Sequence, residues 1–266
     1  MAMVMAKAVV KVEGLTLRFG AYTALFQVNL EVAEGEFLAV VGPTGCGKST
    51  LLNVVSGLLS PSEGQVYTFD EEVRGPNPKV GYLFQQDAIL PWKTALDNVA
   101  LPLVFKGVPL GQAREEALLW LEKVGLKAFV HRFPHQLSGG QRKRVGLAQI
   151  LIPNPQLLLM DEPFSALDIQ TRQRMENELL RLWQAGNGGG RKTVIFITHD
   201  LEEAIALADR VVVFSAGPGS RPIGEFPIPL PRPRDVAEIR LTEGFLRIHR
   251  EIWGLLRKEV EKAYED

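Results

Sequence analysis

Several short segments of the chain consist almost entirely of apolar residues, and each predicts a strand. A continuous apolar run is typical of a strand that is buried on both faces, as in a parallel sheet. The segments of this kind are Phe37–Val41, Leu157–Met160, Val194–Ile197 and Val211–Phe214. Two earlier segments, 9–17 and 25–32, alternate more loosely between apolar and polar residues and predict two further strands.

Helical periodicity dominates the middle of the chain, from 85 to about 152. Segment 111–124 places its apolar residues at spacings of three and four, with charged residues opposite, and 138–151 predicts a second helix. A shorter helix is predicted at 48–58, where Gly57 and Pro61 close it. Buried strands separated by helices predict an α/β fold with a parallel sheet, in which the middle block is an insertion.

The chain beyond the last apolar run has a different composition. Segment 217–234 holds six of the 17 prolines, which predicts an extended connector, and the glycines of 186–190 predict a flexible loop. A final helix is predicted by apolar residues along one face: Phe245, Leu246, His249, Ile252, Trp253, Leu256 and Val260. This face would either pack on the body of the protein or bind a partner, and the sequence alone does not distinguish the two interpretations.

Composition excludes several classes of protein. Thirty Lys and Arg against 31 Asp and Glu give a net charge of −1, which argues against a nucleic-acid partner. One cysteine cannot form an internal disulfide or a zinc site, so we expect a reducing compartment. No apolar stretch reaches the roughly 18 residues of a membrane span, and Met1–Ala6 lacks the features of a signal peptide. Any membrane role is therefore expected to depend on a partner.

A phosphate-binding loop pattern follows the first apolar run: glycine, four residues, then Gly-Lys-Ser. Its residues are Gly42, Pro43, Thr44, Gly45, Cys46, Gly47, Lys48 and Ser49. Glycines let successive backbone N–H groups turn toward phosphate oxygens, and the following helix directs its positive end at them. Lys48 would reach the β- and γ-phosphates, and the Ser49 hydroxyl would bind Mg²⁺. Cys46 is interpreted as a small filler residue, because no base stands beside it in sequence.

Two carboxylates, Asp161 and Glu162, end the second apolar run. An acidic residue at such a strand end can hold Mg²⁺ beside a phosphate loop, and a second one can polarise the water that attacks the γ-phosphate. Alone, Asp-Glu-Pro could be a surface turn. The phosphate loop 113 residues upstream (161 − 48) favours the functional reading.

A second phosphate-binding helix end is predicted at Leu137–Gln141, where a serine and two glycines precede a helix. One ATP does not need two such ends from one molecule. We therefore expect two chains to share each ATP, with this segment pressing on the γ-phosphate from the partner chain.

These motifs, in this order, resemble the ATP-binding subunits of ATP-binding cassette (ABC) transporters over residues 9–215. Segment 165–168 (Ser-Ala-Leu-Asp) is similar to the loop that touches the partner cassette. Segment 198–200 (Thr-His-Asp) is similar to the switch whose histidine contacts the γ-phosphate. Gln85 resembles the glutamine that binds Mg²⁺ and the attacking water and couples to the membrane subunit.

The fold implied by this resemblance is α/β: a P-loop NTPase ABC cassette with a parallel-sheet core, an N-terminal antiparallel β subdomain and an inserted α-helical subdomain. The ATPase domain would span 1–230, with the helical insertion at about 86–152. The connector and amphipathic helix would occupy 231–266.

Site residues also follow from the resemblance. Catalysis would use Lys48, Gln85, Glu162 and His199, and Mg²⁺ would be held by Ser49, Gln85 and Asp161. ATP would be bound by these residues: Phe19, Gly42, Pro43, Thr44, Gly45, Cys46, Gly47, Lys48, Ser49, Thr50, Ser138, Gly139, Gly140, Gln141 and Asp168. Phe19 stands where the family commonly carries a tyrosine that stacks on adenine, and Tyr22 is the alternative nearby.

Within the family, three segments resemble importers of the nitrate, sulfonate and taurine group: 90–92, 95–99 and 230–235. The implied partners are a second copy of the chain in an ATP-dependent homodimer, transmembrane permease subunits and, indirectly, a periplasmic or extracellular solute-binding protein. The implied location is the cytoplasmic face of the cell membrane. The alternative is a soluble ABC-type ATPase of DNA repair or translation. A kinase or GTPase that shares only the phosphate loop does not account for Leu137–Gln141.

Overall fold

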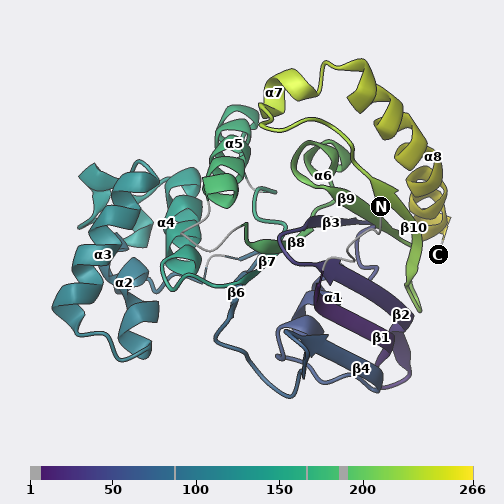
Figure 1. The fold of residues 1–266 in the computed structure, drawn as a ribbon, viewed down its shortest axis with the longest axis horizontal. Coiled ribbons are helices and arrows are strands. Elements are labelled where there is room, and N and C mark those ends of the chain that lie inside the picture. Colours follow the sequence, from purple (N-terminus) through teal and green to yellow (C-terminus); the bar gives the residue numbers. More distant parts are fainter. Residues whose placement is uncertain (1–6, 87, 166, 186–190, 266) are drawn as a thin grey trace.

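The computed structural model describes residues 7–86, 88–165, 167–185 and 191–265, and it contains two sheets (Figure 1). The predicted glycine loop 186–190, the segment 1–6 and Ala166 lie outside the described residues. The smaller sheet is antiparallel, with strand order β2-β1-β4-β5. Its strands are β1 (Ala8–Phe19), β2 (Tyr22–Ala33), β4 (Glu63–Thr68) and β5 (Glu71–Glu72).

The larger sheet has six strands in the order β10-β9-β3-β8-β7-β6. These are β3 (Phe37–Val41), β6 (Val80–Leu83), β7 (Leu157–Asp161), β8 (Thr193–Ile197), β9 (Arg210–Phe214) and β10 (Pro222–Pro227). Neighbouring strands are parallel from β9 through β6, as the continuous apolar runs predict. Each central strand sends alternate side chains into two separate cores. Phe37 and Ala39 face the helices, whereas Leu38 and Val40 face α1 (Lys48–Val55) and the smaller sheet.

The prediction that 217–234 is only an extended connector is wrong in part, because β10 pairs antiparallel with β9 along the sheet edge. Pro222 and Pro227 stand at the two ends of this strand. Proline lacks an N–H donor but is tolerated at the ends of an edge strand. The residues between them form the hydrogen bonds with β9, so proline content alone did not predict this strand.

Three helices from the middle of the chain pack against one another, away from the smaller sheet (Figure 1). They are α2 (Ala95–Phe105), α3 (Leu110–Lys123) and α4 (Gly139–Leu151), with short 3₁₀ turns at Lys127–Phe129 and Pro134–Gln136. The remaining helices are α5 (Ile169–Ala185), α6 (Leu201–Leu207), α7 (Val236–Ile239) and α8 (Glu243–Glu265). The predicted end of the first helix at 58 is too late: α1 ends at Val55, because Gly57 adopts a left-handed backbone (φ +79). No helix among the described residues is long and apolar enough to span a membrane.

Helix α8 packs on the body of the protein, against α6 and β9. Its buried stripe includes Phe245, Ile248, Ile252 and Leu256, at the spacings of a helix face. The predicted face is therefore wrong at Leu246 and Trp253, which are each 44% exposed. The prediction merged two neighbouring faces, because apolar residues continue around the helix beyond the stripe that the core covers.

Two arginines of segment 230–235 fix the chain between β10 and α7 over the end of α6. Arg232 donates to Asp209 Oδ1 and to the Leu207 carbonyl, and its guanidinium lies 4.5 Å from the Trp183 ring centroid. Arg234 is buried and donates to five backbone carbonyls, those of Ile205, Ala206, Ala208, Ile228 and Leu230. Both cations thus satisfy carbonyls that the end of a helix leaves without partners.

Candidate active site

Four motifs meet along one edge of the six-stranded sheet, because β3, β8, β7 and β6 are consecutive parallel strands. The carboxyl ends of parallel strands lie at the same edge. The phosphate loop follows β3, His199 follows β8, Asp161 and Glu162 end β7, and Gln85 follows β6. Segments that are far apart in sequence therefore place their polar side chains in one row.

The loop from Gly42 to Gly47 has the backbone shape that a phosphate cradle requires. Gly45 and Gly47 have φ values of +79° and +93°, which other residues rarely adopt. A Cβ at Gly47 would also lie 2.9 Å from a Leu25 methyl and 3.3 Å from the Ala24 carbonyl, so a side chain there would add crowding to the backbone strain. Helix α1 begins at the next residue, and its free N–H groups favour an anion at this end.

Lys48 is buried within this loop. Its Nζ atom donates to the carbonyls of Gly42 (2.9 Å) and Pro43 (2.8 Å). The Cys46 sulfur lies 3.8 Å from the same Nζ, and burial raises the pKa of the Cys46 thiol. Two backbone carbonyls of the loop thus hold the positive charge of Lys48, and the buried Cys46 side chain packs beside it.

A hydroxyl and a carboxylate meet where the phosphate loop approaches β7. Ser49 Oγ donates to Asp161 Oδ1 at 3.0 Å, and burial raises the pKa of Asp161, opposed by the Ser49 hydrogen bond. Hard oxygen ligands of this kind suit Mg²⁺, which usually takes one or two protein groups, with water and substrate phosphates completing the shell. Among the described residues no group of three or more His, Cys, Asp or Glu could hold a metal ion.

The Glu162 carboxylate is held from two sides. Gln85 Nε2 donates to Glu162 Oε2 at 3.2 Å, and His199 Nδ1 lies 3.1 Å from the same oxygen. The Glu162 backbone is left-handed (φ 43°), a strained conformation for a residue with a side chain, and its N–H donates to the Ile197 carbonyl (2.9 Å). This arrangement aims a carboxylate at the mouth of the phosphate loop, where it can orient and polarise a water molecule.

These groups, apart from Asp161, line a cavity of about 460 Å³. It is lined by Phe19, Tyr22, Ala24, Thr44, Gly45, Gly47, Lys48, Ser49, Thr50, Gln85, Glu162 and His199. Phe19 and Tyr22 are about half exposed (51% and 48%), and both line the cavity. Both aromatic rings are therefore available for stacking on a base, and Ala24 is a lining residue that the sequence patterns did not single out.

Other predicted nucleotide residues do not line this cavity. The Ser138–Gln141 segment begins α4, where Ser138 Oγ accepts from the Gln141 N–H (3.2 Å) and Gln141 Oε1 accepts from the Ser138 N–H (2.8 Å). A Cβ at Gly140 would lie 2.6 Å from Thr171, so this helix end packs closely on α5. Asp168 is exposed and accepts from the Thr171 N–H at 3.0 Å. Gly42, Pro43 and Cys46 belong to the phosphate loop itself and are buried.

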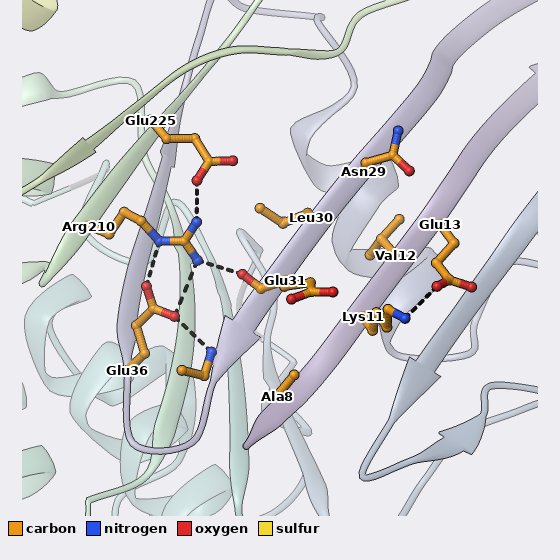
Figure 2. Close-up of a pocket in the computed structure, with 11 residues that line it drawn as sticks. Ala8, Lys11, Val12, Glu13, Asn29, Leu30, Glu31, Glu36, Arg210 and Glu225 are labelled. Atoms are coloured by element: carbon orange, nitrogen blue, oxygen red, sulfur yellow. Dashed lines mark hydrogen bonds and ion pairs between the residues drawn. The ribbon is translucent and has the colours of Figure 1, made fainter. Parts of the chain in front are cut away.

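A wider hollow of about 790 Å³ lies elsewhere, between β1, β2 and β10, and contains none of these groups (Figure 2). Arg210 lies at one side of it and donates to the carboxylates of Glu36 and Glu225 and to the Glu31 carbonyl. Arg210 therefore has a structural role, because these contacts join the smaller sheet to the larger one.

Comparison with known proteins gives one consistent family. A family model described as ABC transporter matches residues 25–165. A protein of Methanocaldococcus jannaschii, described as an uncharacterized ABC transporter ATP-binding protein, is 45% identical over 262 residues, which is 97% of this chain and 94% of the relative. The taurine import ATP-binding protein TauB of Escherichia coli is 46% identical over 201 residues, which is 76% of this chain and 77% of TauB.

Solved structures agree with these relatives. The chain is similar to the dimeric structure of a post-hydrolysis state of an ATP-binding cassette bound to ADP and Pi, with a TM-score of 0.72 and 34% identity. The match covers 82% of this chain and 98% of the solved one.

Proposed function

Because the chain belongs to the ABC transporter family as an ATP-binding subunit and is an ATPase, we propose that it powers solute import through ATP-driven closure of a homodimer. The observation that carries this proposal is that the predicted nucleotide-binding residues fall into two separate groups. The phosphate loop, Glu162 and His199 line one cavity, whereas Ser138–Gln141 lies outside it at the start of α4. A second chain is needed to bring such a helix end to the same ATP, and the dimeric neighbour supports that arrangement.

In this proposal the two chains form two Mg·ATP sites. Lys48 and the amides of the loop would bind the phosphates, and Ser49, Gln85 and Asp161 would hold Mg²⁺. Mg²⁺ supplies positive charge to the phosphate oxygens. Glu162 orients the attacking water, and His199 and Gln85 fix that carboxylate in place. Ser138 and Gly140 complete the site from the partner chain.

The permease would dock in a groove of about 270 Å³ between β6 and the helices α2 and α4. Phe84, Ile89 and Pro102 line this docking groove, and Phe84 directly precedes Gln85. A permease segment placed there would touch the residue next to the glutamine that contacts Glu162. Together with the likeness to import ATP-binding proteins, this groove supports a peripheral location at the cytoplasmic face of the membrane.

The solute class rests on the likeness to TauB together with the segments 90–92, 95–99 and 230–235. We propose an importer of nitrate-, sulfonate- or taurine-type solutes, in which a separate solute-binding protein selects the molecule. In this chain segment 230–235 is structural, since Arg232 and Arg234 anchor it to α6.

Mass spectrometry of the proteins that co-purify with the tagged chain from its own detergent-solubilised membranes tests this function. We expect a multi-spanning permease and a solute-binding protein, and calorimetry of that binding protein with taurine, an alkanesulfonate and nitrate then identifies the solute. Recovery of soluble ribosomal or DNA-repair proteins alone would overturn the transport proposal. Phe84→Ala should reduce permease recovery, whereas Phe26→Ala, an equally exposed aromatic on the smaller sheet, should not (39% and 41% exposed).

A further inference from the structure

A buried network of polar residues lies directly behind His199. The Thr198 hydroxyl donates to Glu203 Oε2 at 2.6 Å and accepts from the Asp200 N–H at 3.0 Å. Asp200 Oδ1 in turn accepts from the N–H groups of Glu202 (2.9 Å) and Glu203 (3.2 Å) and so caps α6. Both neighbours of His199 are therefore tied to the first turn of α6, and the course of the backbone through His199 follows from these contacts.

Glu203 does not line the nucleotide cavity, and its side chain is buried, with 3% exposed. The charged groups that face it are Glu176 and Arg172 from α5 and Asp200 from the start of α6. Two of these three are acidic. Arg240 pairs with Glu176 (3.3 Å), and Arg172 is the cation that reaches both Glu203 and Asp200. A buried carboxylate without a positive neighbour is strongly disfavoured.

Arg172 joins the network to the loop that precedes α5. Its guanidinium donates to Asp200 Oδ2 (3.2 Å) and to the Leu167 carbonyl (3.4 Å), and its Nε lies 3.8 Å from Glu203 Oε1. Leu167 stands next to Asp168, in the segment that resembles the loop contacting a partner cassette. One planar side chain thus contacts this loop, the cap of α6 and the carboxylate that holds Thr198.

From these contacts we propose that Arg172 and Glu203 are positioning residues for His199, and that Arg172 links the placement of His199 to the loop around Leu167 and Asp168. The coupling to a partner chain rests on the proposed function, whereas the positioning itself does not. In the proposed dimer, a partner that seats Asp168 fixes the Leu167 carbonyl and with it Arg172. Thr198 and Asp200 then hold the His199 ring against Glu162.

The first test reads His199 without any turnover. Histidine side-chain NMR of the full chain, labelled with ¹⁵N-histidine, resolves four imidazoles, and His199→Gln assigns the relevant one. We expect Arg172→Gln and Glu203→Gln to move the His199 ring resonances and to leave those of His131 and His249 in place. The matched control is Arg181→Gln, on the same helix, because Arg181 is exposed and pairs with Glu178. An unmoved His199 resonance in both folded variants would overturn the proposal.

The second test separates turnover from ATP binding. For Arg172→Gln we expect kcat to fall by about tenfold or more, with the Kd for ATP of the isolated chain within about twofold of the original. Equal loss of binding and turnover would point to a structural role alone. If Arg172→Gln does not fold, Arg172→Lys replaces it, because an ammonium keeps the charge but lacks the planar fork that the guanidinium presents to Asp200 and Leu167. A chain that never dimerises with ATP would contradict the proposed function, while the NMR result would still decide the positioning role.

Discussion

His199 Nδ1 lies 3.1 Å from Glu162 Oε2, although 37 residues separate them in sequence. They meet because β7 and β8 are adjacent parallel strands, with Asp161 opposite Ile197 in the register. Gln85 reaches the same oxygen from the end of β6. The carboxylate therefore has one defined position above the phosphate loop, and the strand order of the sheet sets that position.

Replacing Glu162 by glutamine should trap an ATP-bound dimer. The amide keeps the size of the side chain and its contact with Gln85 or His199, but it cannot accept a proton from water. Closure should therefore persist while hydrolysis is lost. Light scattering with Mg·ATP should report twice the monomer mass for Glu162→Gln and the monomer mass for the double variant with Lys48→Ala. A Glu162→Gln chain that stays monomeric at saturating Mg·ATP would contradict the shared-site model.

Ser138→Arg should abolish hydrolysis while leaving ATP affinity of the single chain within about twofold, since Ser138 does not line the cavity of its own chain. Ser138 also caps α4, and loss of such a cap costs about 1 kcal/mol. Ser138→Ala separates the two effects, because it removes the cap without adding bulk or charge. Equilibrium binding of a fluorescent ATP analogue and a phosphate-release assay measure both quantities. Lost ATP binding in Ser138→Arg would place the segment in the site of its own chain.

The stability of the protein should depend on pH through Glu203. Burial raises the pKa of Glu203 from its ordinary value of 4.5 to about 7. Between these values the folded chain retains a proton that the unfolded chain has released, so the free energy of unfolding falls as pH rises through this window. A shift of this size corresponds to about 3 kcal/mol.

Glu203→Gln removes this contribution. Urea unfolding from about pH 5 to about pH 8 should show the variant gaining stability relative to the original chain as pH rises, with a flat difference above the pKa in the folded state. Parallel stability curves for the two proteins across the whole range would show that Glu203 does not titrate there.

Arg234→Ala should destabilise the fold by about 3 kcal/mol, because it leaves buried carbonyls at the end of α6 without their donor. Burial lowers the pKa of Arg234 to about 10, so the side chain remains charged at neutral pH. Urea unfolding followed by circular dichroism measures the loss. The control is Arg250→Ala on the exposed side of α8, which should change stability by less than about 0.5 kcal/mol. Equal effects of the two substitutions would argue against an anchoring role for Arg234.

The elements that sequence patterns predicted best are those whose burial is complete. Phe37–Val41 and the apolar run from Leu157 are buried on both faces, so every residue in them had to be apolar. Predictions were less accurate where one residue type occurs in more than one structural setting. The prolines of 222–227 end an edge strand rather than prevent one, and Leu246 and Trp253 lie outside the stripe that the core covers.

The sequence by itself determined the chemical groups of the site. Glycines at positions that require a left-handed backbone, a lysine and serine at a helix start, and acidic residues at a strand end follow from local rules that act over a few residues. Tertiary structure decided which of these groups meet. The contacts of Glu162 with Gln85 and His199, and of Arg172 with Glu203, depend on strand order and helix packing. Strand order and helix packing are set by the burial of two apolar cores on opposite faces of one sheet. That burial involves the whole chain, so no local sequence pattern contains it.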